Sequence, residues 1–383
     1  MSDRKEEAQG AKILKTDNQE GYALRGTYPT SLVTEIDPED VIGYDALWDS
    51  MEKCKRGVIW KGSVARFYLN APTEIYRLSE ELHNGTYIPH PPIEFQVTRP
   101  KLRDISSTAF RDRIVQRSLI DNAIYPCMSS RWIIDNYACQ TGKGTDFARK
   151  RYTQHLQRFH RKYGINGYSL QSDIRKYYDN MYYDVIFSNF RKRCPDWVVD
   201  LIEYIVMYQY SNDEKAKGVK PGSPLIQIAG IDYLSDMDHY IKERLFIKYY
   251  SRYMDDFILI NPDRDYLRYC MDEIADFLKP IGLELHPDKT HIKPITSRIS
   301  FLGFNFRLLT SGKVVETVKK ESVYNTKRRI KRMGRSGKVA EETLDGSYDG
   351  WRAHANKGDS YLLIRDMDNW YDSVKYEFYP DNV

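Results

Sequence analysis

The chain has 383 residues, 41% of them hydrophobic and 29% charged, and its formal net charge is +4. This composition indicates a globular protein with more than one lobe and excludes disordered and fibrous classes. No run of about 18 apolar residues and no apolar signal segment occurs, so we expect a cytoplasmic protein with no membrane partner. Five scattered cysteines without a C-x-x-C pair argue against a zinc site or a disulfide framework.

Basic residues are concentrated in two segments. Residues 326–338, "TKRRIKRMGRSGK", hold seven Lys or Arg and no acid, and residues 150–165 form a second basic stretch. Each is either a solvated helix face or a surface for a polyanion, and the sequence leaves both interpretations open.

The first half of the chain predicts a flexible lead followed by helices and two strands. We expect residues 1–40 to be the lead and residues 41–83 to be helical, with Asn84-Gly85 closing the last helix. "PPIEFQVTRP" predicts a strand, and "PKLRDISS" predicts a second, basic strand before a helix that starts near Phe110. A basic helix then runs to about Lys162.

The middle of the chain alternates differently. A strand ending at Asp173 is followed by helices, a hairpin over 249–260, a helix over 264–278 and the short strands of "ISFLGFNF". This order predicts an α+β fold with a split β-α-β-β sheet and helices on one face. The remainder, from about Val318, is basic and predicted to be helical.

Three carboxylates are expected to meet at one edge of that sheet. Asp255 and Asp256 lie at the hairpin turn in "YYSRYMDDFILI", and Asp173 ends the neighbouring strand. Three such charges need cations to neutralise them, and hard oxygen ligands select Mg²⁺, with Mn²⁺ as a substitute. Two ions would support a phosphoryl displacement. Taken alone, the Asp255-Asp256 pair could equally be a solvated hairpin tip.

Five motifs in order resemble a reverse transcriptase: D-x-x-x-Y-Y, G-x-x-x-G-S…Q, Y-M-D-D, L-x-P-D-K-T and F-L-G-F. More narrowly, "FRDRIVQRSL", "NYACQTGKGT" and "GWRAHANKGDSY" resemble bacterial enzymes of the diversity-generating retroelement type. Retron, group II intron and defence-associated enzymes are similar as well. The resemblance implies a right-hand polymerase with fingers over 41–165, a palm over 166–316 that carries part of the fingers, and a helical thumb over 317–383.

The resemblance also implies roles at the catalytic and nucleotide sites. Asp173 and Asp255 would be the main ligands of two Mg²⁺ ions, and Asp256 would add charge to the same site. Lys289 is a candidate proton donor to departing pyrophosphate, or else a surface lysine. The residues that would hold the incoming dNTP are Lys101, Arg103, Tyr178 and Gln227. Among them Tyr178 is the candidate sugar gate that excludes a 2′-hydroxyl, or else a core tyrosine.

Further residues are expected at the template and primer. Arg111 and Arg113 either contact template phosphates or pair with Asp112. Phe301 and Gly303 match the primer grip, or else two core strands. The other candidate contacts are Lys143, Gly222, Ser223, Arg328, Arg329 and Arg332, the last three on the thumb.

One departure from the resemblance leaves the function open. "KPGSPLIQ" over 220–227 carries extra prolines, and Ile226 stands where the retroelement type has a serine. We expect a reverse transcriptase that copies a dedicated non-coding RNA into DNA in a bacterial or phage retroelement or an antiphage defence system. Its partners would be the RNA, a DNA primer or product, dNTPs and possible accessory proteins or self-association. The alternatives are a polymerase of the same fold without a template or with a protein primer, and a non-catalytic nucleic-acid scaffold.

Overall fold

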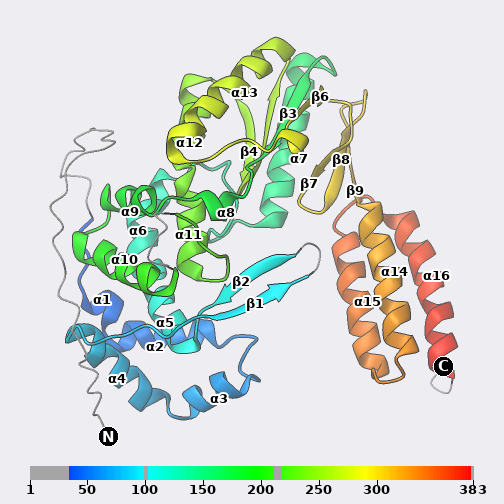
Figure 1. The fold of residues 1–383 in the computed structure, drawn as a ribbon. Coiled ribbons are helices and arrows are strands. Elements are labelled where there is room, and N and C mark those ends of the chain that lie inside the picture. Colours follow the sequence, from blue (N-terminus) through cyan, green and yellow to red (C-terminus); the bar gives the residue numbers. More distant parts are fainter. Residues whose placement is uncertain (1–33, 99–101, 211–216, 381–383) are drawn as a thin grey trace, which may run out of the picture. The chain divides into compact units, whose positions relative to one another are not determined.

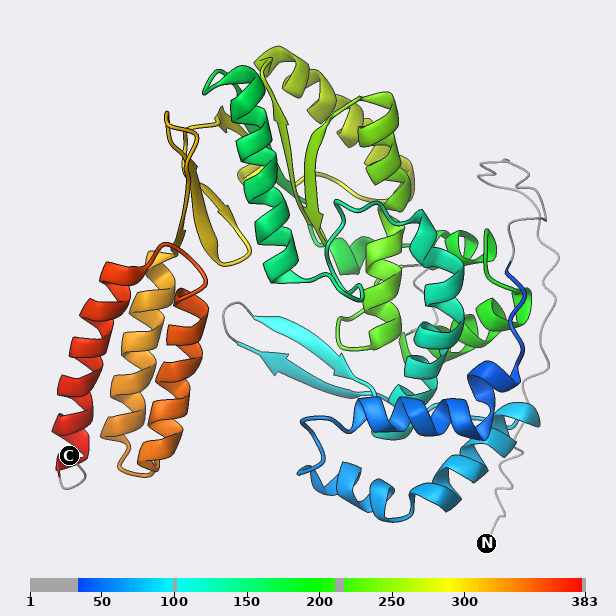
Figure 2. The same ribbon diagram turned by 180° about the vertical axis from the view of Figure 1, so that it is seen from behind.

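The structure, a computed structural model, describes residues 34–98, 102–210 and 217–380 (Figures 1 and 2). Residues 34–40 fall within the predicted flexible lead, but Ile36 packs against the core and Thr34 is hydrogen-bonded to a distant part of the chain. The amide of Thr34 donates to the carbonyl of Arg193, and a short helix that buries Val41 begins at Glu39.

The first group of elements is helical with one projecting hairpin. Its core comes from the apolar stripes of α2, α4 and α5, which bury Leu47, Ile75 and Ile114 completely. Gly85 has a φ of +65° just after α4, as the predicted helix end requires. The elements are α1 (Glu39–Ile42), α2 (Tyr44–Cys54), α3 (Gly62–Leu69), α4 (Ala71–His83), β1 (Ile93–Val97), β2 (Arg103–Ser107), α5 (Phe110–Ser118) and α6 (Tyr125–Met128).

The second group contains the predicted split sheet. Its four strands are antiparallel neighbours in the order β4-β5-β3-β6. The first of them in the chain, β3, therefore lies between the β4–β5 hairpin and β6. The strands are β3 (Tyr168–Asp173), β4 (Tyr249–Tyr253), β5 (Asp256–Asn261) and β6 (His291–Pro294). The helices between them are α8 (Tyr177–Asn180), α9 (Tyr183–Arg191), α10 (Asp196–Tyr210), α11 (Pro224–Tyr233), α12 (Ser235–His239) and α13 (Arg264–Leu278).

Helices pack on both faces of this sheet, whereas the sequence predicted helices on one face. Tyr250, Phe257 and Leu259 point into the core shared with α13, while Tyr249, Ile258 and Ile260 point into a second core with α7 (Thr145–Tyr163). The hairpin is apolar on both sides, which is the pattern of a strand covered twice. The basic helix α7, predicted to belong to the fingers, therefore packs with the palm (Figure 2).

The C-terminal group has a three-stranded sheet and three helices. The strands are β7 (Ile299–Phe301), β8 (Phe304–Leu308) and β9 (Val314–Val318), and the helices are α14 (Lys320–Arg335), α15 (Glu341–Ala355) and α16 (Tyr361–Phe378). Stacking of Tyr348 on Tyr371, with ring centroids 4.0 Å apart, joins α15 to α16. Arg149 of α7 lies 3.9 Å from the ring centroid of Phe304 and pairs with Glu316, so α7 also supports this second sheet. None of the helices in the described ranges is long and apolar enough to cross a membrane.

Candidate active site

Three carboxylates meet where β3 ends and the β4–β5 turn begins. Asp173 is directly opposite Asp256 in the antiparallel register of β3 and β5, and Asp255 immediately precedes Asp256. Residues paired in this way have Cα atoms about 4.5–5.5 Å apart. The sheet register therefore brings the three predicted metal ligands to one place.

This concentration of negative charge changes the acidity of the site. Burial, together with the charges of Asp173 and Asp255, raises the pKa of Asp256 to about 7. Burial and the charge of Asp173 also raise the pKa of Asp255, while Lys289 and Arg103 oppose that rise. The fully ionised cluster is therefore unfavourable without additional positive charge.

A lysine supplies part of that charge. Nζ of Lys289 lies 2.8 Å from Oδ1 of Asp173. Within the described part of the chain, no three Asp, Glu, His or Cys side chains stand in a preformed metal-binding arrangement. The chemistry of the donor set nevertheless fits a hard divalent cation, because it consists of carboxylate oxygens that burial and like charge make costly to ionise together.

A buried ion pair holds the turn that carries these acids. The side chains of Arg252 and Asp238 are both fully buried, and Nε and Nη2 of Arg252 donate to the two Asp238 oxygens at 2.7 and 2.6 Å. The hydroxyl of Tyr250 donates to the same carboxylate at 2.7 Å. This bidentate pair links β4 to α12, and bidentate geometry fixes orientation as well as distance.

The same arginine also binds the turn itself. Its Nη1 donates at 2.9 Å to the carbonyl of Met254, a residue with a φ of +57° that directly precedes Asp255. Its Nη2 donates at 2.9 Å to the carbonyl of Ile231 in α11. A left-handed methionine is strained and needs such support. Arg252 was not predicted from the sequence. The available signal was its position in the strand, two residues after Tyr250, which places both side chains on the same buried face.

Two of the predicted nucleotide residues, Tyr178 and Arg103, are close enough to this turn for their charges to interact with Asp255. Tyr178 is partly buried, and its ring lies against Gly230, where an added Cβ would be 3.3 Å from Cε1. The charge of Arg103, an exposed residue of β2, acts on both Asp255 and Tyr178. Gln227 is exposed on α11, whose later residues are buried. Lys101 lies outside the described residues.

Gly222 brings the loop before α11 against β2, and Ser223 joins the same loop to α5. Gly222 has a φ of +135°, and a Cβ there would lie 2.3 Å from the carbonyl oxygen of Ser106, so only glycine fits. Ser223 is buried and donates to Gln116 at 2.8 Å. The hydroxyl of Ser223 is therefore bonded within the protein. Ser223 would affect the template only by fixing the position of the loop before α11.

Three predicted template contacts are instead engaged within the protein. Arg111 pairs with Glu81 and lies over the ring of Tyr87, with Asp112 farther away at 3.8 Å. Arg113 reaches the carbonyl of Thr108 and the hydroxyl of Ser107.

Lys143 binds two backbone carbonyls, those of Asn136 at 2.8 Å and Ile133 at 3.1 Å. Burial lowers its pKa to about 8. The Lys143 ammonium therefore fastens the loop around residues 133–136, and its role as a template contact stays a prediction.

The predicted primer-grip residues belong to the β7–β8 turn and the second core. Phe301 is fully buried against Tyr152, which supports the alternative of a core residue. Leu302 and Gly303 both have positive φ angles, 49° and 86°, as a tight hairpin turn requires. Gly303 lies beside His354 of α15, so this turn contacts the thumb helices.

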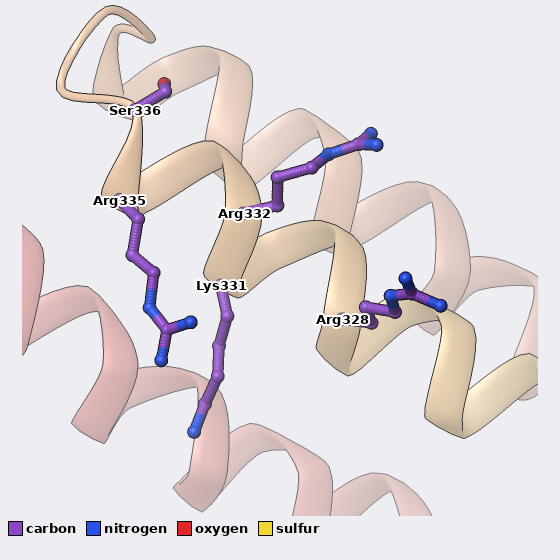
Figure 3. A pocket seen from close by; sticks show the side chains of 5 residues that line it. All are labelled: Arg328, Lys331, Arg332, Arg335 and Ser336. Carbon is purple, nitrogen blue, oxygen red and sulfur yellow. The ribbon is translucent and has the colours of Figure 1, made fainter.

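The predicted thumb arginines divide into two sets. Arg328 and Arg332 line a hollow of about 540 Å³ with Lys331, Arg335 and Ser336 (Figure 3). Positions 328, 331, 332 and 335 share one face of α14 because they are separated by three or four residues. Arg329 instead donates to the carbonyl of Ser347 in α15 at 2.8 Å.

Comparison with known proteins agrees with this geometry. Residues 89–306, more than half of the chain, match the model of the family described as reverse transcriptase (RNA-dependent DNA polymerase). The chain belongs to the reverse transcriptase family. The fold is accordingly that of a right-hand polymerase, and the matched residues include the four-stranded sheet β3–β6.

A solved structure and the curated proteins complete the comparison. The structure of apo telomerase from Candida tropicalis matches with a TM-score of 0.42 and 15% identity, over 61% of this chain and 49% of that one. The reverse transcriptase chain thus spans about half the length of that telomerase chain. None of the curated proteins matches this reverse transcriptase chain.

Removing Arg252 should destabilise this reverse transcriptase strongly. We expect Arg252→Met to lower the free energy of unfolding by about 3–5 kcal/mol, because it leaves Asp238 charged and buried. Arg268→Met is the matched control, since Arg268 forms an exposed pair with Asp265 and should cost about 0–1 kcal/mol. Denaturant unfolding measures both, and an equal effect of the two changes would contradict the assigned role of Arg252.

The acidic cluster should make stability depend on pH when divalent cations are removed. The pKa of Asp256 is raised from 3.8 to about 7. Between about pH 4 and pH 7 the folded state therefore retains a proton that the unfolded state has released. The free energy of unfolding should therefore fall by roughly 1–3 kcal/mol as pH rises from about 4 to about 7.

The matched variant for this measurement is Asp256→Asn, in which that part of the pH dependence should disappear. Added Mg²⁺ should restore stability to the wild-type protein at neutral pH, since a ligand that binds only the folded state stabilises it. Identical pH profiles for the wild type and the variant would refute the electrostatic account of the site.

Proposed function

We propose that this chain is an RNA-directed DNA polymerase that joins dNTPs by two-metal-ion nucleotidyl transfer. The observation that carries this proposal is the meeting of Asp173, Asp255 and Asp256 at the palm turn, with the pKa values of Asp255 and Asp256 raised by burial and like charge. Membership of the reverse transcriptase family supports the same activity.

Each residue of the site has a defined task in this proposal. Asp173 and Asp255 would hold two Mg²⁺ ions, or Mn²⁺ in their place, and Asp256 would add negative charge behind them. When bound, the ions would stabilise the attacking and departing oxygens of the displacement. Lys289 pairs with Asp173 in the absence of cations, and it would give a proton to the departing pyrophosphate.

The nucleotide would enter between the fingers hairpin and α11. Arg103, and by family resemblance Lys101, would bind its triphosphate, since cations stabilise charge on a transferring phosphoryl group. The ring of Tyr178 lies against Gly230, and an aromatic face under the incoming sugar would leave no room for a 2′-hydroxyl, which would favour dNTPs. Gln227, exposed on α11, would face the nascent base pair.

The biological setting is the finer part of the proposal. The motifs that resemble bacterial retroelement enzymes support a chain that copies a dedicated non-coding RNA in a bacterial or phage retroelement or an antiphage defence system. Sequencing of RNA that purifies with the protein tests this setting. One recurrent, structured RNA would support it, and random cellular RNA would reject it.

Changing the acids should abolish synthesis. We expect purified protein with Mg²⁺ to incorporate dNTPs on a primed RNA template, and Asp255→Ala with Asp256→Ala to reduce the rate by at least about 10³-fold. Parallel reactions with a DNA template and with no template test the alternative of untemplated or protein-primed synthesis, which equal product without template would support. Undiminished incorporation by the double variant would refute the site.

The basic face of α14 should bind the primer-template duplex. We expect Arg328→Ala with Arg332→Ala to weaken duplex binding and to reduce the slope of log K against log salt by roughly 2, since each phosphate that is no longer neutralised accounts for about one unit. Arg329→Ala is the control, because Arg329 is engaged by Ser347 and its removal should leave the slope unchanged. Anisotropy titrations at several salt concentrations measure this, and equal slopes for all three proteins would exclude the face.

A further inference from the structure

Residues 53–69, "KCKRGVIWKGSVARFYL", run from the end of α2 through α3 and contain five Lys or Arg but no acid. Large apolar side chains are exposed in the same segment. Trp60 is 76% exposed and Leu69 80% exposed, and Ile59 and Tyr68 are also exposed. Neither the catalytic site nor the thumb uses any of them.

The buried side of α3 explains how this segment packs against the protein. It does not explain why cationic and apolar side chains are exposed on the other side of the helix. Val64 is buried, and Phe67 makes an edge-to-face contact with Phe110 of α5, with centroids 5.3 Å apart. These two residues anchor α3 beside α4 and α5 (Figure 1). Arg66 and Leu69, three residues apart, lie together on the opposite, exposed face of the helix.

Neighbouring acids neutralise only part of the positive charge. Lys53 pairs with Asp121, and Lys55 pairs with Glu52 while lying over the ring of Tyr68. Among the ion pairs of the described residues, none involves Arg56, Lys61 or Arg66. We call these three cations, together with Trp60 and Leu69, the α3 surface.

The indole of Trp60 is held in place although it is exposed. Its Nε1 donates at 3.0 Å to the carbonyl of Gly57, and Nζ of Lys61 lies 5.7 Å from its ring centroid. A fixed aromatic face loses little conformational entropy when a ligand stacks on it. An aromatic face next to cations that no carboxylate neutralises is the combination that binds single-stranded nucleic acid.

We propose that the α3 surface binds the single-stranded part of the RNA template, with a base stacked on Trp60 and phosphates paired with Arg56, Lys61 and Arg66. This inference rests on the proposed function, in which RNA is the strand with an unpaired region and the DNA product leaves as a duplex. The absence of acids over residues 53–69 favours this occupant over a basic or mixed-charge protein surface.

The test compares RNA binding by full-length variants in the absence of dNTPs. The probes are a labelled primer-template with an unpaired RNA overhang of about 20 nucleotides, the same duplex with blunt ends, and single-stranded DNA of the overhang sequence. Trp60→Ala with Lys61→Ala and Arg66→Ala should weaken binding of the overhang probe roughly tenfold and reduce its salt slope by about 1.4. Binding of the blunt duplex should not change.

Two further variants make the outcome decisive. Arg268→Ala with Tyr269→Ala, an exposed cation and an exposed aromatic on α13, should leave all three affinities unchanged. Lys61→Glu with Arg66→Glu should reproduce the weaker binding without removing the aromatic residue.

Unchanged overhang binding by both α3 variants, an equal decrease on the blunt duplex, or a decrease confined to single-stranded DNA would each overturn the proposal. Because no nucleotide is incorporated, the result is independent of polymerase activity. A protein that failed to make DNA, but whose RNA affinity fell in these variants, would contradict the proposed function and leave the α3 surface standing.

Discussion

The buried pair of Arg252 and Asp238 is the interaction on which the geometry of the active site depends. One guanidinium connects β4 to α12, to α11 and to the carbonyl of Met254, the left-handed residue next to Asp255. Burying two charges is costly, and a buried pair contributes orientation more dependably than stability. Here the orientation matters because the turn must hold Asp255 and Asp256 opposite Asp173 against their mutual repulsion.

The meeting of the three carboxylates and the strands that bring them together could be predicted because they depend on local patterns. The strand-favouring residues around "YMDD" and the strand ending at Asp173 specify the hairpin, its neighbour and their shared edge. The partner of Arg252 could not be predicted, since Asp238 lies on a helix whose contact with β4 is set by tertiary packing. For the same reason the sequence predicts that α7 belongs to the fingers, whereas its apolar stripe packs against β4.

The predictions for basic residues show a second limit of the sequence. Arg111, Lys143 and Arg329 are predicted to contact the template or the primer-template duplex, but each is engaged by a carboxylate or a carbonyl. Whether a cation faces solvent depends on what the fold brings next to it. Arg328 and Arg332 differ from Arg329 only by position around one helix, and Trp60 stands out only after its exposure is known.

The most direct test of the central claim is anomalous scattering from crystals of the protein grown with Mn²⁺, a primed RNA template and a non-hydrolysable dNTP. The account predicts two anomalous peaks roughly 3.5–4 Å apart, both within ligand distance of the carboxylates of Asp173 and Asp255, with Lys289 displaced from Asp173. Peaks elsewhere, or none at these carboxylates while Lys289 remains paired with Asp173, would contradict it.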